Sequence, residues 1–367
     1  MTSETQNGMI RVGIIGLGFG GESALKGFRL LPNVEIVGLA GLEEDRLAYL
    51  GDTYGIPTSG RYRDYQDLLA NEQLDAVSVG VPNSLHAPIA IAALERGLHV
   101  LCEKPLARNS EEAASMVEAA TRANRVLQVV FNHRERDDVQ TLKRYIDEGK
   151  LGKIYYAKAY WMRRRGIPGA GSWFVNKNMA GGGPLIDLGV HVLDMVLHLL
   201  AEPSVLTVSA STYNELGSRG VGFDLKARKS GAGHGYEVED LATAFLRLSN
   251  GGTLLLETSW ATHSSAQDDY GIVLYGTDGG ADIRVKNYNT ENTVTIYTDI
   301  AGAPSEIHPH VRGGQFHNAV TQTFIERIVG GNWSQYNGSD GLRRARIIDA
   351  CYTSALQGRE VLIETEA

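Results

Sequence analysis

One stretch of the chain, residues 181–194, combines glycines with two carboxylates and a histidine. Asp187 and His191 are four residues apart, so on a helix their side chains project from one face, and Asp194 lies near that face. An oriented histidine beside a carboxylate suits general acid–base catalysis near neutral pH. The alternatives are a helix-start aspartate with a buried core histidine, or a metal site. No second histidine has the usual metal spacing, and we expect no metal.

A second candidate group is the turn Glu103-Lys104-Pro105, which follows the apolar run at 99–102. Pro105 restrains the backbone of Lys104 and allows a cis peptide bond, which would hold the lysine side chain in one direction. A lysine held near another positive charge should have a lowered pKa and could take part in proton transfer. The alternative is a simple solvent-facing turn.

The glycines at 16–21 match the pattern G-x-G-x-x-G at Gly16, Gly18 and Gly21, with Phe19 and Gly20 between them. The pattern follows an apolar strand and precedes a helix. In that setting the first glycine permits a tight turn, the second lets the backbone approach a pyrophosphate, and the third lets helix pack on strand. The helix N-terminus then offers N–H groups to phosphates. We predict a dinucleotide site, with a merely tight turn as the alternative.

The end of the second strand bears on the choice of dinucleotide. The pattern expects an acid for the adenosine ribose about 20 residues after the glycines. Gly41 and Leu42 stand there instead, and Glu43 could substitute for the missing acid. The nearest basic residue is Arg46, which does not adjoin Gly41 as a 2′-phosphate would need. We predict NAD as the cofactor, with NADP possible.

Two further strand ends add predicted cofactor contacts, because ligands bind at the carboxyl ends of parallel strands. The first comprises Val81, Pro82, Asn83 and His86, and the second is the Glu103-Lys104 turn. Asn83 could donate to a ribose or cap the following helix, and the residue types favour neither interpretation.

The elements that position these residues alternate in the first third of the chain. Apolar runs predict strands at 10–15, 34–40, 76–81, 99–102 and 126–131, with helices at 22–31, 43–54, 85–96 and 110–124. Short apolar strands alternating with amphipathic helices predict an α/β domain with a doubly wound parallel sheet. We assign residues 1–130 to this dinucleotide-binding domain.

The remaining residues, 131–367, have a different pattern. Helices are predicted at 138–148, 184–200, 315–329 and 339–356, and strands at 154–162, 205–213, 241–248, 253–261, 271–275, 281–285 and 293–298. Consecutive strands with little helix between them indicate a large antiparallel sheet. We expect this α+β domain to bind substrate and to form the contacts between subunits.

Composition narrows the class of function. The chain of 367 residues has 35 Lys and Arg against 43 Asp and Glu, a net charge of −8, and no long basic run. We therefore expect neither nucleic acid nor an anionic membrane as partner. No stretch reaches 18 uninterrupted apolar residues, and residues 1–9 are polar. With Cys102 and Cys351 as the chain's two cysteines, we expect a reducing, cytoplasmic location.

The glycine pattern at 16–21, the Glu103-Lys104-Pro105 turn and the Asp187-to-Asp194 spacing together resemble the Gfo/Idh/MocA family of sugar and polyol oxidoreductases. The resemblance extends along essentially the whole chain, including 238–240 and 340–355. It implies a Rossmann domain followed by a domain built on a large open antiparallel sheet.

For the site, the resemblance implies a catalytic trio of Lys104, Asp187 and His191, with a hydride moving to or from nicotinamide. Either His191 or Lys104 would handle the hydroxyl proton, and Asp187 would orient the pair. An open sheet with one uncovered face further implies a homodimer or homotetramer.

The segment 161–168, followed by Trp173, resembles a subgroup that acts on glucosides and anhydrosugars such as levoglucosan, commonly at C3. The predicted substrate-binding residues are Lys104, Asn132, Arg163, Trp173, Asp187 and His191. Arg163 would donate hydrogen bonds and Trp173 would supply an aromatic platform. An inositol dehydrogenase or a sugar-ketone reductase remains an alternative. A non-catalytic NAD-binding sensor or scaffold is a further alternative, although it would not need the trio.

Overall fold

The computed structural model describes residues 8–169, 171–224, 235–311 and 314–363, which form two compact units. The first unit comprises Met1–Asn132 and Phe316–Arg343, and the second comprises His133–Gln315 and Arg344–Ala367. The sequence placed one boundary near residue 130, whereas in the structure the segment 316–343 returns to the first unit. Most of the polar N-terminal segment, residues 1–9, lies outside the described residues.

The first unit contains a parallel sheet in the strand order β3-β2-β1-β4-β5-β6. Its strands are β1 (Ile10–Ile15), β2 (Val34–Ala40), β3 (Arg61–Tyr62), β4 (Ala76–Val79), β5 (His99–Cys102) and β6 (Leu127–Val129). In this register Ile14 lies opposite Leu39 on one side and Ser78 on the other. The order is that of a Rossmann sheet, and it places the carboxyl ends of β1, β2, β4 and β5 along one edge.

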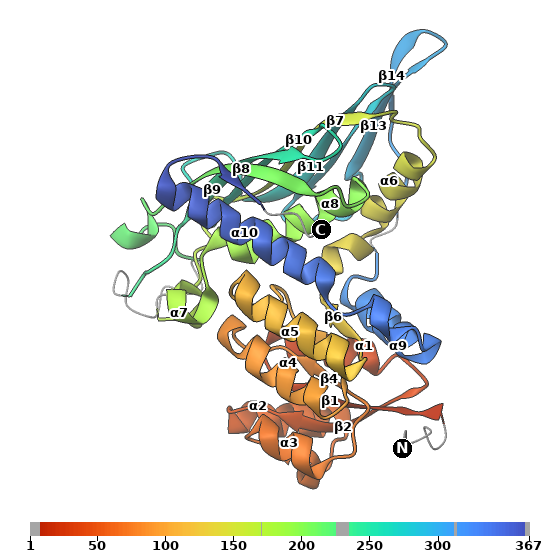
Figure 1. Ribbon diagram of the computed structural model, residues 1–367, viewed down its shortest axis with the longest axis vertical. Helices are drawn as coiled ribbons and strands as arrows, with labels where there is room; N and C mark the ends of the chain where they lie inside the picture. The colour runs from red at the N-terminus through yellow and green to blue at the C-terminus, as the bar shows by residue number, and fades with distance from the viewer. Residues whose placement is uncertain (1–7, 170, 225–234, 312–313, 364–367) are drawn as a thin grey trace. The chain divides into compact units, whose positions relative to one another are not determined.

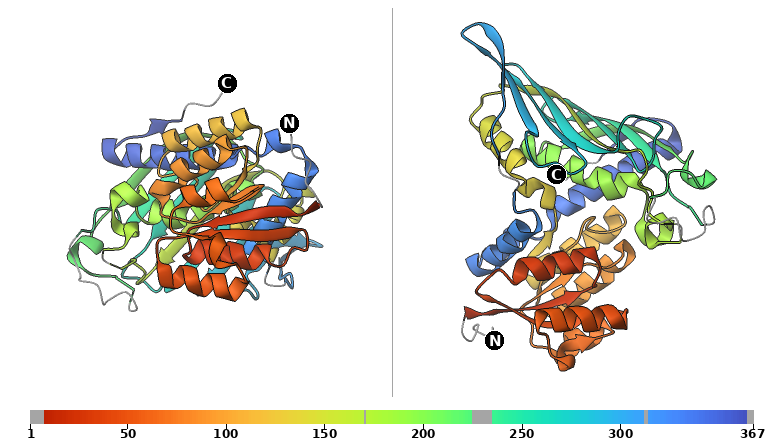
Figure 2. Two further views of the ribbon diagram at one scale, coloured as in Figure 1. Left: turned by 90° about the horizontal axis from the view of Figure 1, so that it is seen from below. Right: turned by 180° about the vertical axis from the view of Figure 1, so that it is seen from behind.

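Helices cover both faces of this sheet (Figures 1 and 2). They are α1 (Phe19–Phe28), α2 (Glu44–Tyr54), α3 (Tyr65–Asn71), α4 (His86–Glu95), α5 (Ser110–Ala123) and the late helix α9 (His317–Gly330). The ring of Phe324 on α9 lies 6.3 Å from that of Phe28 on α1. Val320 and Ile325 join the same buried core, so apolar burial holds the returning segment in the first unit.

The second unit contains a nine-stranded sheet in the order β14-β13-β12-β11-β7-β10-β9-β8-β15. Its strands are β7 (Ile154–Arg163), β8 (Val205–Tyr213), β9 (Leu241–Leu248), β10 (Thr253–Ser259), β11 (Asp268–Gly276), β12 (Gly280–Lys286), β13 (Val294–Ile300), β14 (Ala303–Ile307) and β15 (Val361–Leu362). The sheet is mixed, because β7 and β10 run parallel while the other neighbouring pairs are antiparallel.

Helices pack on one face of this sheet (Figure 1). They are α6 (Asp137–Asp147), the π-helical turn η6 (Leu185–Gly189), α8 (Val190–Leu199) and α10 (Ser339–Gln357), and the short helix α7 (Lys177–Ala180) packs against the turn Trp173–Val175. α10 spans the division between the units, and its Ser354 hydroxyl accepts from the amide of Ala210 on β8 at 2.9 Å. The sequence predicted one helix over 184–200, and the structure begins that segment with the π-helical turn.

One helical stretch within the described residues, Lys177–Leu199, is long and apolar enough to cross a membrane on length and composition alone. Its most apolar window is 89% buried inside the structure, as in the core helix of a globular protein. The stretch also carries Asp187, His191 and Asp194.

Candidate active site

The glycine loop after β1 meets two different demands. Gly16 has a φ of +89°, and a Cβ there would lie 2.3 Å from the carbonyl oxygen of Gly80. A Cβ on Gly21 would lie 1.8 Å from the carbonyl oxygen of Gly16. In contrast, no described atom lies within 4 Å of a Cβ on Gly18. Close backbone contacts within the protein therefore require glycine at positions 16 and 21. Gly18 instead leaves open space beside the turn.

The helix α1 begins beside that space, with Gly18 at its N-cap. No described side chain caps the helix, so its first-turn N–H groups have no side-chain acceptor. The ring of Phe19 is 80% exposed, and it packs edge-on against His317 at 5.6 Å. An uncapped helix N-terminus next to an open glycine fits a dinucleotide pyrophosphate. His317, from the returning segment, gave no sequence signal for this site.

At the end of β2, a Cβ on Gly41 would come within 2.7 Å of the Leu17 side chain. Packing therefore explains the glycine that stands where an acid was expected. Leu42 is exposed, and so is Glu43, which sits at the N-cap of α2. The guanidinium of Arg46 donates to the carbonyl of Leu17 at 3.0 Å and pairs with Glu22. Arg46, the basic residue nearest to Gly41 in the sequence, is thus bound to the loop backbone and to the carboxylate of Glu22.

After β4, Val81 and Pro82 are half-buried, and Asn83 is buried at the start of the 3₁₀ turn Asn83–Leu85. His86 is fully buried. Its Nδ1 lies 2.8 Å from the carbonyl oxygen of Pro105 and its Nε2 lies 2.9 Å from that of Val81. The buried ring of His86 thus links the β4 and β5 turns, and a contact of His86 with the cofactor stays a prediction.

The turn after β5 contains a cis peptide bond between Lys104 and Pro105. A Cβ on Gly20 would meet the Glu103 side chain at 2.7 Å, so this carboxyl group lies against the glycine loop. Burial raises the pKa of Glu103 to about 7, against the opposing effect of the positive charge on Lys104. The structure thus brings the predicted β1 and β5 residues together at one edge of the sheet.

In the second unit, Asp187 lies in the π-helical turn η6, and π-helical turns occur frequently at functional sites. Its Oδ2 accepts a hydrogen bond from Nε1 of Trp260 at 2.9 Å. Trp260 follows β10 and is completely buried. The indole therefore fixes the carboxylate, and the sequence did not identify this residue.

His191 is buried in the first turn of α8, where it faces a cluster of aromatic rings. Its ring centroid lies 4.6 Å from that of His133 and 5.6 Å from that of Trp161. Tyr270 stacks on Trp161 at 4.3 Å, and Tyr288 meets Trp161 edge-on at 6.1 Å. We call these five residues the aromatic cluster; apart from His191, sequence reasoning did not find its members.

Arg163 lies at the end of β7, beside this cluster. Its guanidinium carbon lies 5.5 Å from the Trp161 ring centroid. Nε donates to Asp268 at 3.0 Å, and Nη2 donates to the hydroxyl of Tyr288 at 2.9 Å. Asp268 also accepts from Nε1 of Trp161 at 2.7 Å. Because a guanidinium has five N–H donors, Arg163 keeps further donors after these two bonds.

Two further predicted substrate residues, Trp173 and Asn132, stay predictions. Trp173 forms part of the 3₁₀ turn Trp173–Val175 and stacks on Phe174 at 3.8 Å, outside the aromatic cluster. Asn132 is buried at the start of a 3₁₀ turn and ends the first unit's initial segment. Lys104 also belongs to the first unit, whereas Asp187 and His191 belong to the second.

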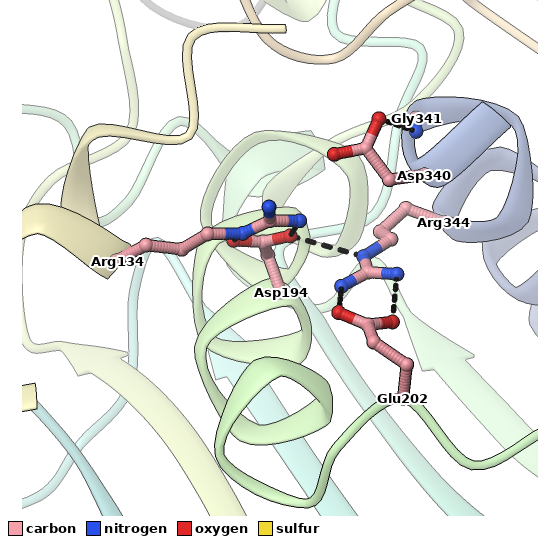
Figure 3. A network of polar contacts seen from close by, with 6 residues as sticks. All are labelled: Arg134, Asp194, Glu202, Asp340, Gly341 and Arg344. Carbon is pink, nitrogen blue, oxygen red and sulfur yellow. Dashed lines mark hydrogen bonds and ion pairs between the residues drawn. The ribbon is translucent and has the colours of Figure 1, made fainter. Parts of the chain in front are cut away.

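Asp194 belongs to a different set of contacts, shown in Figure 3. Its carboxylate accepts from Arg134 at 2.6 and 2.5 Å and from Nε of Arg344 at 3.0 Å. Arg344 in turn donates twice to Glu202, each time at 2.6 Å. Asp194 therefore anchors α8 to neighbouring segments of the second unit. Among the described residues, no group of three His, Cys, Asp or Glu side chains could hold a metal ion.

Comparison with known proteins decides the family. Residues 10–131 match the model of the oxidoreductase family with an NAD-binding Rossmann fold, GFO_IDH_MocA, and residues 139–282 match the GFO/IDH/MocA C-terminal domain. The chain is 31% identical to D-glucoside 3-dehydrogenase of Escherichia coli K12, over 98% of this chain and 99% of that protein. The chain belongs to the Gfo/Idh/MocA family. As a member, it is an NAD-dependent oxidoreductase of the sugar dehydrogenase type.

Other similarities agree with this assignment. The chain is 29% identical to levoglucosan dehydrogenase of Pseudarthrobacter phenanthrenivorans, over 94% of this chain and 96% of that protein. A solved structure of levoglucosan dehydrogenase in complex with NADH has the same fold, with a TM-score of 0.85. The two sequences are 24% identical over 97% of this chain and 100% of the other.

Proposed function

We propose that this Gfo/Idh/MocA member oxidises a ring hydroxyl of a glucoside or of an anhydrosugar such as levoglucosan, with C3 as the reacting carbon. The observation that carries the proposal is the set of polar side chains held around the buried ring of Trp161. An imidazole (His191) and a guanidinium (Arg163) both face this one aromatic ring. A ring with several hydroxyls needs directed hydrogen-bond donors for recognition, and the buried Trp161 ring fixes where these two side chains lie. The full-length relative named D-glucoside 3-dehydrogenase supports the same substrate class.

The reaction removes a hydride from the carbon and a proton from its hydroxyl, which leaves a ketone. NAD, when bound, supplies the hydride acceptor, and the open Gly18 turn with the uncapped α1 would hold its pyrophosphate. His191 takes the hydroxyl proton in this proposal, and Lys104 holds and polarises the reacting oxygen. Asp187, fixed by the Trp260 indole, binds a neighbouring hydroxyl and orients the histidine.

A sugar panel tests the proposal. The purified protein is incubated with methyl glucosides, levoglucosan, myo-inositol and aldoses, each with NAD and with NADP, while formation of the reduced cofactor is followed. The product ketone is located by NMR. We expect turnover of a glucoside or of levoglucosan, with NAD, at C3. Selective turnover of myo-inositol would show that the protein is an inositol dehydrogenase and would contradict the proposed substrate class. NAD binding without turnover of any sugar would favour the sensor alternative.

A further inference from the structure

The segment that carries Asp187 and His191 starts in three glycines: Gly181 has a φ of +88°, and close packing explains the other two. A Cβ on Gly182 would lie 1.9 Å from the hydroxyl oxygen of Tyr352. A Cβ on Gly183 would lie 2.1 Å from the carbonyl oxygen of Glu239. The backbone of this turn is thus pressed against two residues that come from distant parts of the second unit.

The carboxylate of Glu239 accepts hydrogen bonds from that turn. Oε2 accepts from the amide of Gly183 at 2.9 Å, and Oε1 accepts from the amide of Leu185 at 3.1 Å. The hydroxyl of Tyr352 donates to Oε1 at 2.9 Å. All three donors point at one buried side chain, and their hydrogen bonds oppose the effect of burial, which raises the pKa of Glu239.

We call the Glu239 carboxylate with its three donors, on Gly183, Leu185 and Tyr352, the clamp, and its hydrogen bonds continue to Asp187. The carbonyl oxygen of Gly183, whose amide is bound by Glu239, accepts from the amide of Asp187 at 3.1 Å. The residue next to Glu239 acts from the other side, because the carbonyl oxygen of Asp240 accepts from the amide of Trp260 at 2.9 Å. Trp260 then donates to the Asp187 carboxylate. The backbone and the side chain of Asp187 are therefore both held through the Glu239-Asp240 dipeptide.

We propose that Glu239, with Tyr352 as its partner, is a positioning residue: the pair fixes the π-helical turn and so sets where Asp187 and His191 meet the substrate. The proposal rests on the dehydrogenase function above. A group displaced by even about 1 Å from its productive geometry costs up to ~100-fold in rate. Glu239 binds the backbone amides of the turn, and it acts on Asp187 and His191 through the backbone of that turn.

Two variants test the pair, and one control matches them. Tyr352→Phe removes the hydroxyl that donates to the carboxylate, and Glu239→Gln keeps the side-chain volume but replaces an acceptor oxygen by an NH₂ group. The control is Tyr236→Phe, because the Tyr236 hydroxyl donates to the main-chain carbonyl of Glu239 at 3.0 Å instead of to its carboxylate. Tyr236→Phe loses a bond to the main chain of Glu239, whereas Tyr352→Phe loses the bond to its carboxylate and a bond with the backbone of Ile186 in the turn itself.

We expect kcat for the sugar to fall about tenfold in Tyr352→Phe and up to ~100-fold in Glu239→Gln. NAD affinity should stay within about twofold, because the glycine loop belongs to the other unit. Tyr236→Phe should show a similar change in Tm and a kcat within about twofold of the wild type. If Glu239→Gln does not fold, Tyr352→Phe alone carries the comparison.

Amide hydrogen exchange gives a readout that does not depend on the substrate. The amides of Gly183, Leu185 and Asp187 should exchange at least about tenfold faster in Tyr352→Phe, and at the wild-type rate in Tyr236→Phe. Equal exchange and equal kcat losses in the two tyrosine variants would overturn the positioning role. If the wild type turns over no sugar, the proposed function fails, and the exchange rates still decide whether the clamp holds the turn.

Discussion

At the residue scale, His191 and Lys104 have the strongest proposed chemical roles. A general base in hydrogen-bond reach typically contributes ~10²–10⁴-fold to a rate, and neither residue belongs to the glycine loop proposed to hold the phosphates. We therefore predict that His191→Asn and Lys104→Ala each lower kcat by about 10²-fold or more while NAD still binds. Steady-state kinetics and NAD titration by fluorescence check this. Near-normal turnover in both variants would make the trio structural and would refute the proposed mechanism.

Glu103 makes the stability of the protein depend on pH in a defined direction. Burial raises its pKa to about 7 from the ordinary 4.5. The folded state therefore binds the proton more tightly than the unfolded state. The resulting stabilisation is complete below pH 4.5 and is lost as the pH rises through about 7.

In Glu103→Gln this dependence should be absent. Between pH 4.5 and 7 the free energy of unfolding of the wild type should fall relative to the variant, by an amount on the order of 3 kcal/mol. Urea unfolding of the cofactor-free proteins at several pH values measures the difference. Subtracting the free energy of unfolding of one protein from that of the other cancels the contribution of buried histidines. His317, whose pKa is lowered to about 4, is one of them. Parallel pH curves would show that Glu103 is not the group responsible.

At the scale of elements, different glycines of the loop serve folding and NAD binding. A Cβ at Gly18 would meet no described atom within 4 Å, whereas a Cβ at Gly21 would overlap the Gly16 carbonyl at 1.8 Å. We predict that Gly18→Leu folds with nearly unchanged Tm and loses NAD affinity by about 100-fold. Gly21→Ala should instead lower the free energy of unfolding by at least ~2 kcal/mol. Calorimetry of folding and of NAD binding distinguishes the two. Intact NAD affinity in Gly18→Leu would place the cofactor elsewhere.

The strands were the most predictable elements. β1 and β2 lie at the residues expected, because strands buried on both faces need continuous apolar runs. β3, Arg61–Tyr62, has two residues and no such run, so nothing local indicated it. The helix carrying Asp187 was expected to be regular throughout. Its π-helical start lies where Glu239, Tyr352 and Trp260 form hydrogen bonds around the turn. These partners are distant in the sequence, so the pattern of residues within the segment does not indicate them.

At the scale of the whole molecule, the sequence predicted two domains with different sheets but not the return of 316–343. An amphipathic helix shows that one face is buried and does not show which core buries it. Phe324 packs with Phe28, a contact that helical periodicity alone does not reveal. His317 enters the candidate site through the same return, which explains why the motifs did not include it.

The sheet of the second unit has one face on which, within the described residues, no helix packs (Figures 1 and 2). At its centre Leu255 on β10 lies opposite Phe245 on β9 and Lys158 on β7, and Val273 on β11 is also opposite Lys158. The apolar side chains among them, those of Leu255, Phe245 and Val273, are only partly buried in a single chain. An apolar sheet face left open to water is a site of association, so we propose that two copies pack face to face.

A charge at the centre of that face tests the assembly. We predict a homodimer or homotetramer for the wild type and a monomer for Leu255→Lys, because the new ammonium group would lie beside Lys158 and would lose its hydration at the interface. Leu356→Lys is the control, since Leu356 is 89% exposed on α10, away from the sheet face. Light scattering at micromolar concentration measures the mass. A monomeric wild type, or equal dissociation of both variants, would show that this face is not the interface. A tetramer that Leu255→Lys reduces to dimers would mean that a second surface holds the remaining pair, because one isologous face closes at two subunits.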